Sequence, residues 1–265
     1  MWRASEDEPR LGAGGNFKKG MSAAGRLHEN QRAFMQKTSL ILFDIDGTLL
    51  TSGGAGEHAL RAGFEEEFGI RDDLRRIEIS GRTDSGIALQ MLKLHGIGVS
   101  AENLERFYGG YLRNLARELP ARPGRLLPGI WEVLEALVRM PHVALGLLTG
   151  NLQDGARLKL EHYRVAHFFP FGAFADDHHD RNELGRFALA RARDTHGVEF
   201  MPQQVTVIGD TPHDISCARA VGARAVAVAT GGFRAEQLAE HGPDVLLEDM
   251  GNLPRALEAL QLRAH

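Results

Sequence analysis

The chain lacks several features that mark large classes of protein. It has one cysteine, Cys217, among 265 residues, so it cannot form an internal disulfide, and a secreted disulfide scaffold is excluded. No apolar run approaches the ~20 residues that span a bilayer, so we expect no membrane association. The formal net charge is -4, which argues against a broadly basic nucleic-acid binder. The hydrophobic fraction of 43% is ordinary for a globular chain, and we expect a cytoplasmic protein.

The first 38 residues differ from the rest of the chain. Seven of their residues are basic and four acidic, so this segment carries +3 and the remainder -7. It has few large apolar side chains and no apolar stretch typical of a signal peptide. A segment of this composition buries too little surface to offset chain entropy. We therefore expect residues 1–38 to form a disordered leader.

Beyond residue 38, short apolar runs alternate with helical patterns. Strands are predicted at Ser39–Phe43, Val143–Leu148, Phe171–Phe174, Val205–Ile208, Ala225–Ala229 and Val245–Leu247. Helices are predicted between them at Ile130–Arg139, Leu152–Tyr163, Asn182–His196, Asp214–Val221 and Arg234–Glu240. Apolar strands separated by helices predict a doubly wound α/β domain with a parallel sheet. Ligands of such folds bind beyond the carboxyl ends of the strands.

One stretch interrupts this alternation. About 100 residues separate the first two predicted strands, far more than one crossover helix needs. Helical patterns fill its middle, at Glu57–Phe68, Ser85–His95 and Glu102–Glu118. We interpret residues 52–126 as a helical cap inserted into a core of residues 39–51 and 127–265. Gly53–Gly56 lacks the residue spacing of a nucleotide-binding loop. We interpret it as a hinge between the core and the cap.

Acidic residues cluster at two predicted strand ends. Asp44 and Asp46 follow the first strand, and the period of two in extended chain gives them the same direction. Asp210 and Asp214 follow the fourth strand along the chain, where Asp214 alone could also be a helix cap. The alternative for Asp44 and Asp46 is a turn in which these aspartates accept hydrogen bonds from nearby backbone amides. Together the four carboxylates form a hard oxygen cluster of the kind that suits Mg²⁺.

Two further strand ends carry groups suited to an anion. Thr149, Gly150 and Asn151 lie between the second strand and a helix, and a helix N-terminus with a hydroxyl and an amide is an anion site. A plain helix cap by Thr149 or Asn151 is the alternative. Arg181 precedes the helix after the third strand and could reach an oxyanion. The adjacent His178 and His179 more simply form a solvated loop, because no third metal ligand has useful spacing.

These elements, in this order, resemble the haloacid dehalogenase-like (HAD) hydrolase superfamily. Asp44–Thr48 matches its first motif, Asp-x-Asp-Gly-Thr; Thr149 matches its second; Arg181 stands where its third usually has lysine; and Asp210 and Asp214 match its fourth. The resemblance covers about residues 39–262 and is nearest to the phosphoglycolate-phosphatase-like branch. It implies a HAD-like Rossmannoid core with a helical cap.

The resemblance also implies a mechanism, in which Asp44 is the nucleophile and Asp46 the general acid and base. Mg²⁺ would be held by Asp44, the backbone carbonyl of Asp46, Asp210 and Asp214. Thr149, Gly150, Asn151 and Arg181 would bind the phosphoryl group, and Arg82 in the cap would face an anionic part of the substrate. The expected reaction is hydrolysis of a small-molecule phosphate ester through an aspartyl-phosphate.

Two other functions stay open at this stage. A mutase of the same superfamily would transfer phosphate between positions of a sugar. A non-catalytic regulator could use the same scaffold, although a binding-only domain has no need for both Asp44 and Asp46. Within residues 81–84, Thr83 or Asp84 could instead cap the following helix. The sequence leaves the leaving alcohol and the oligomeric state undetermined.

Overall fold

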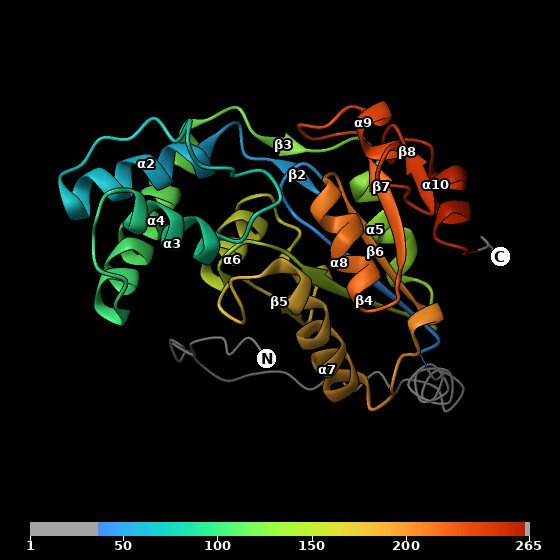
Figure 1. Cartoon of the computed structure of the whole chain (residues 1–265). Helices are drawn as coiled ribbons and strands as arrows, with labels where there is room; N and C mark the ends of the chain where they lie inside the picture. The colour runs from blue at the N-terminus through green and yellow to red at the C-terminus, as the bar shows by residue number, and fades with distance from the viewer. Residues whose placement is uncertain (1–36, 263–265) are drawn as a thin grey trace, which may run out of the picture.

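A six-stranded parallel sheet forms the centre of the protein. The computed structural model describes residues 37–262. Its strands lie in the order β5-β4-β1-β6-β7-β8, and every neighbouring pair is parallel (Figure 1). They span β1 Ser39–Phe43, β4 Val143–Leu148, β5 Gly172–Ala173, β6 Val205–Gly209, β7 Arg224–Val228 and β8 Val245–Leu247. The predicted α/β class is confirmed.

Helices cover both faces of this sheet because alternate strand residues supply apolar surface to each face. In β1, Ile41 and Phe43 belong to one hydrophobic cluster, and Leu40 and Leu42 to another. The first cluster packs under α5 (Ile130–Val138), α6 (Gln153–His162) and α10 (Leu253–Ala259). The second packs under α7 (Leu184–His196), α8 (Pro212–Ala220) and α9 (Ala235–Ala239) and includes the buried Cys217.

A separate group of helices follows β1 in the chain. It consists of α2 (Ala55–Phe68), α3 (Asp84–Leu94) and α4 (Ala101–Ala121), which share a third hydrophobic cluster and lie to one side of the sheet in Figure 1. Gly63 and Gly110 let α2 and α4 approach closely, since a Cβ on Gly63 would lie 2.6 Å from Gly110 backbone. The short strands β2 (Leu50–Thr51) and β3 (Arg125–Leu126) pair antiparallel where this helical region leaves and rejoins the sheet.

The structure differs from the sequence-based expectation in some short elements and, by one to three residues, in several helix bounds; α4 runs through Pro120 to Ala121, whereas the predicted helix ends at Glu118. The two-residue strands β2 and β3 and the seven-residue helix α10 were not among the predicted elements. β2 and β3 have two residues each, too few for a periodic pattern; β5 is as short, but it lies within the predicted apolar run Phe171–Phe174. α10 is instead specified by its end, where Asn252 accepts a hydrogen bond from the amide of Arg255 at 3.1 Å.

Two further expectations concern the N-terminal leader and the membrane. Residues 1–36 of the predicted leader lie outside the described residues, so the leader stays a prediction. Over residues 37–262, none of the helices combines the length and apolar character required to span a membrane.

Candidate active site

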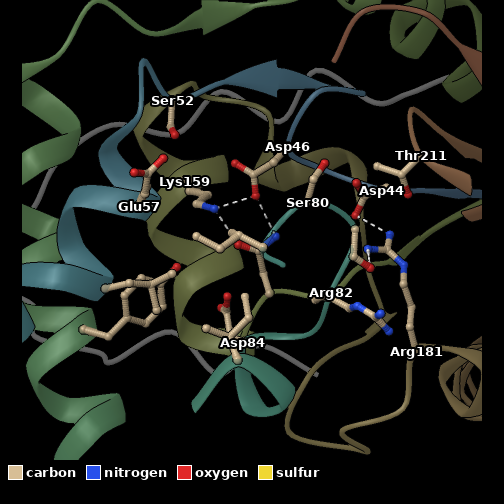
Figure 2. Close-up of a pocket in the computed structure, with 18 residues that line it drawn as sticks. Asp44, Asp46, Ser52, Glu57, Ser80, Arg82, Asp84, Lys159, Arg181 and Thr211 are labelled. Atoms are coloured by element: carbon tan, nitrogen blue, oxygen red, sulfur yellow. Dashed lines mark hydrogen bonds and ion pairs between the residues drawn. The ribbon is translucent and has the colours of Figure 1, made fainter. Parts of the chain in front are cut away.

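A cavity of about 190 Å³ lies beyond the carboxyl ends of the central strands, between the sheet and the helical region (Figure 2). Its walls include Asp44, Asp46, Gly150, Asn151 and Arg181 from the sheet side, all of them residues that the sequence singled out. Ser52, Gly56, Ser80, Arg82, Asp84 and Tyr111 line it from the β2 loop and the helical region. The structure thus brings together strand ends that are more than 100 residues apart in sequence.

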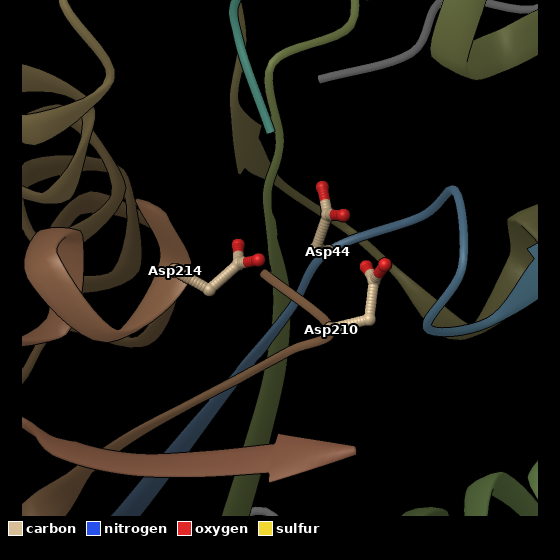
Figure 3. Close-up of side chains that lie close together, drawn as sticks. All are labelled: Asp44, Asp210 and Asp214. Atoms are coloured by element: carbon tan, nitrogen blue, oxygen red, sulfur yellow. The ribbon is translucent and has the colours of Figure 1, made fainter. Parts of the chain in front are cut away.

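Three of the predicted carboxylates converge at this edge of the sheet. Asp44 follows β1, Asp210 follows β6, and Asp214 lies in the first turn of α8. One oxygen of each lies within 4.8 Å of the others, and all three residues are buried (Figure 3). Asp214 is fixed by Thr211, whose amide and hydroxyl donate to its Oδ2 at 3.0 and 2.7 Å. Asp214 therefore closes a capping box whose cap residue is Thr211.

Arg181 supplies a positive charge to this cluster. Its Nη2 lies 2.9 Å from Asp44 Oδ1 and also donates to Asp214 Oδ1. Its Nη1 donates at 3.0 Å to the carbonyl of Gly81 in the helical region. Its buried Nε has no hydrogen-bond partner among the described residues. Because Arg181 lines the cavity, its positive charge could also act on an anion bound there.

The balance of charge favours a bound cation. Burial raises the pKa of Asp44 to about 6, although Arg181 opposes this rise. Burial and the neighbouring Asp214 also raise the pKa of Asp210. One guanidinium thus faces three buried carboxylates, and like charges this close repel unless a cation or proton lies between them. The all-oxygen donor set fits a hard divalent ion such as Mg²⁺.

Asp46 has a different environment from Asp44. Its side chain is 42% exposed, whereas that of Asp44 is 6% exposed. Asn151 Nδ2 donates to Asp46 Oδ2 at 2.9 Å, and Lys159 Nζ lies 2.5 Å from the same oxygen. The two carboxylates therefore line one cavity with separate partners: Arg181 for Asp44, and Asn151 with Lys159 for Asp46 (Figure 2).

The segment after β4 closes against the helical region. Gly150 is required there, because a Cβ would lie 2.2 Å from the carbonyl oxygen of Arg82. The carbonyl of Gly150 accepts from the amide of Asp84 at 2.7 Å. Thr149 Oγ1 accepts from Asn151 Nδ2 at 2.9 Å. Neither Thr149 nor Asn151 caps α6, whose N-cap is Leu152 without a side-chain bond, so the plain-cap alternative is wrong.

The loop of residues 81–85 is fastened to the sheet side. Thr83 caps α3 by accepting from the amide of Gly86, as one alternative predicted, and its hydroxyl donates to the carbonyl of His179 at 2.5 Å. Ser85 Oγ donates to the carbonyl of Ala175 at 2.8 Å. Arg82 lines the cavity while its guanidinium pairs with Glu78, 2.8 Å from Nε to Oε2. The predicted role of Arg82 toward substrate stays a prediction.

Sequence reasoning missed Lys159, Asp84 and Tyr111 as members of this site. Lys159 is only 3% exposed. A signal for it exists in the sequence, because Lys159 falls at helical spacing on the buried face of α6 with Ala156 and Leu160. A charged residue on an apolar face indicates a buried ionic partner.

The burial of Asp84 can be tested through the pH dependence of the unfolding free energy. Burial raises its pKa from 3.8 to about 6, opposed by Lys159 and by the amide of Leu152, which donates to Asp84 Oδ2 at 2.8 Å. A carboxyl whose pKa is higher in the folded state stabilises the fold when protonated and loses this contribution as the pH rises through the folded pKa. The advantage of Asp84→Asn over the parent in unfolding free energy should therefore grow by about 2 kcal/mol from pH 4 to pH 7. Urea unfolding at both pH values measures this change.

The exposed Asp73 provides the control for this substitution. Asp73→Asn should follow the pH dependence of the parent. If Asp84→Asn also follows it, the carboxyl of Asp84 is not destabilised by burial.

Known proteins share both the sequence and the fold of this chain. Residues 41–228 match the model of the haloacid dehalogenase-like hydrolase family. The phosphoglycolate phosphatase of Synechococcus elongatus is 28% identical, covering 83% of this chain and 97% of the relative. The probable phosphatase IndB of Dickeya dadantii is 26% identical over 83% of this chain and 94% of the relative.

The solved structure of CbbY from Rhodobacter sphaeroides in complex with phosphate has a similar fold. It superposes with a TM-score of 0.68 at 21% identity and covers 85% of this chain and 100% of CbbY. A mutant of CbbY has been solved with xylulose-(1,5)bisphosphate. The family model spans most of the chain, including the first, second and fourth motifs and Arg181, so the chain belongs to the haloacid dehalogenase-like hydrolase family.

Proposed function

We propose that the protein is a Mg²⁺-dependent phosphatase that hydrolyses a small phosphate monoester through an aspartyl-phosphate on Asp44. The observation that carries this proposal is the contrast between its two cavity carboxylates. Asp44 is buried against Arg181, and Asp46 is half-exposed beside Asn151 and Lys159. Two carboxylates in such different environments suit two different roles in one reaction.

In the first step, Asp44 attacks phosphorus and the bond from phosphorus to the leaving oxygen breaks. Asp46 gives its proton to that oxygen, so that the product leaves as an alcohol. Arg181 and Thr149 would hold the phosphoryl oxygens, together with the backbone of Gly150 and Asn151. In the second step, water attacks phosphorus, Asp46 takes a proton from it, and the bond between Asp44 and phosphorus breaks.

The carboxylates beside Asp44 would hold the metal ion. Asp44, Asp210 and the backbone carbonyl of Asp46 are its proposed ligands, with Asp214 supporting them directly or through water. When bound, Mg²⁺ offsets the repulsion between the carboxylate of Asp44 and an anionic phosphate. Arg181 contributes to the same end, because its guanidinium already contacts the carboxylates of Asp44 and Asp214.

The walls of the cavity suggest a small, polar substrate. We propose that residues 52–126 act as a cap that encloses the leaving group, since Ser80, Arg82 and Tyr111 of this region line the cavity. A volume of about 190 Å³ accommodates a small metabolite. Arg82 is the proposed partner of a second anionic group. The names of two relatives suggest phosphoglycolate or a similar phosphorylated acid.

A panel of phosphorylated metabolites tests this function. The purified protein with Mg²⁺ should release inorganic phosphate from small phosphorylated acids faster than from nucleotides. Product analysis by ³¹P NMR distinguishes the alternatives: an isomerised sugar phosphate without free phosphate would indicate a mutase. A protein that turns over no member of the panel would contradict the proposal and favour a regulator.

A further inference from the structure

Lys159 is a buried cation that the proposed chemistry does not use. It lies on α6, outside the four motifs, and is 3% exposed. Burying an ammonium is costly unless other groups replace its hydration. Lysine is among the residues least often found fully buried. Lys159 at the wall of the cavity therefore requires partners that stabilise its buried ammonium.

Those partners are Asp46, the proposed general acid and base, and Asn151. Lys159 Nζ lies 2.5 Å from Asp46 Oδ2 and 2.6 Å from Asn151 Oδ1, while Asn151 Nδ2 donates to Asp46 Oδ2 at 2.9 Å (Figure 2). Both donors thus act on a single oxygen of Asp46. The other oxygen, Oδ1, has no donor among the described residues, so it is available for proton transfer.

The ammonium also interacts with the helical region. The charge of Lys159 acts on Asp84, which accepts a hydrogen bond from the amide of Leu152 at 2.8 Å. Gly56 of α2 lies close as well, since a Cβ there would be 3.6 Å from Nζ. Lys159 therefore contacts a carboxylate from the sheet side and is attracted by one from the helical region.

We propose that Lys159 is a positioning residue that holds Asp46 by Oδ2 so that Oδ1 faces the leaving oxygen. The proposal rests on the proposed phosphatase function. Lys159 contributes no proton in either step: Asp46 Oδ1 gives its proton to the leaving alkoxide and later receives one from the attacking water. The charge of Asp84 attracts the ammonium from the side of the helical region, so this region helps to set the orientation of Asp46.

The test compares leaving groups in Lys159→Met. An alkyl phosphate needs protonation of its leaving oxygen, whereas p-nitrophenolate leaves without it. We expect kcat/KM for the alkyl phosphate to fall ~10²-fold and that for p-nitrophenyl phosphate to fall less than ~5-fold. The inhibition constant for inorganic phosphate should stay within about twofold, because Lys159 does not contact Asp44 or Arg181. Lys159→Arg should restore part of the lost alkyl activity.

Two further variants make the outcome specific. Lys93→Met removes an exposed lysine of α3 and should leave both activities unchanged. If Lys159→Met does not fold, the double variant Lys159→Met/Asp84→Asn takes its place in the assay. This double variant removes one charge of each sign. An equal fall for both substrates, or a change in KM alone, would overturn the proposal.

Asp46→Asn separates this inference from the function on which it rests. It should show the same leaving-group selectivity as Lys159→Met, but more strongly. If Asp46→Asn is selective and Lys159→Met is not, the positioning role is wrong while the phosphatase stands. If the parent enzyme shows no phosphatase activity that depends on Asp44, both are wrong.

Discussion

Asp44→Asn should reduce phosphate release from every substrate by at least ~10⁴-fold, because the variant has no carboxylate to attack phosphorus. The substitution is nearly isosteric. It replaces a carboxyl whose pKa is raised to about 6 by burial, so it removes a charge that burial disfavours. We therefore expect the variant to keep its circular dichroism spectrum and its cooperative thermal unfolding. Steady-state phosphate release at saturating substrate measures the loss.

Asp176→Asn is a control for the same chemical change elsewhere. Asp176 is exposed and accepts a hydrogen bond from the amide of Gln153, outside the acidic cluster. Its variant should keep the parent activity. Activity of Asp44→Asn above about one-hundredth of the parent would mean that another residue, or water directly, attacks phosphorus.

Removal of divalent metal should have the second-largest effect. After treatment with EDTA, kcat/KM should fall at least ~10²-fold, and added Mg²⁺ should restore it. The reason lies in the charge of the cluster: three buried carboxylates face one guanidinium, and an anionic phosphate would add to the repulsion.

Metal binding also has a readout that is independent of turnover. Added Mg²⁺ should raise the Tm of the parent, since a ligand that binds only the folded state stabilises it. Asp210→Asn should lose most of this rise. Full activity in the presence of EDTA, or an equal rise of Tm in parent and variant, would show that the acidic cluster does not hold the ion.

The sequence predicted the fold well because the central strands are buried on both faces. β1 and β4 have the predicted bounds, and both are continuous apolar runs that only a doubly covered sheet explains. The acidic strand ends could also be predicted to meet, since parallel strands place their carboxyl ends at one edge. The family follows from the same residues, and its model matches residues 41–228.

The contacts of the helical region with the sheet could not be predicted in this way. Lys159 and Asp84 lie 75 residues apart in sequence, and nothing in the local pattern of either one identifies the other as a neighbour. Gly150 illustrates the same limit: its lack of a side chain matters only because the carbonyl of Arg82 packs against it. Such requirements arise from tertiary approach: the pattern of α6 indicates that Lys159 is buried, but not which carboxylates surround it.

The most direct test of the account is to identify the phosphorylated residue. Asp46→Asn should accumulate the phosphoenzyme, because it lacks the base that activates water in the second step. Rapid acid quenching after mixing with Mg²⁺ and p-nitrophenyl phosphate, whose leaving group needs no proton from residue 46, followed by peptide mass spectrometry, should find one phosphoryl group on Asp44. A phosphoryl group on another residue, or an initial burst of product with no phosphorylated peptide, would contradict the mechanism.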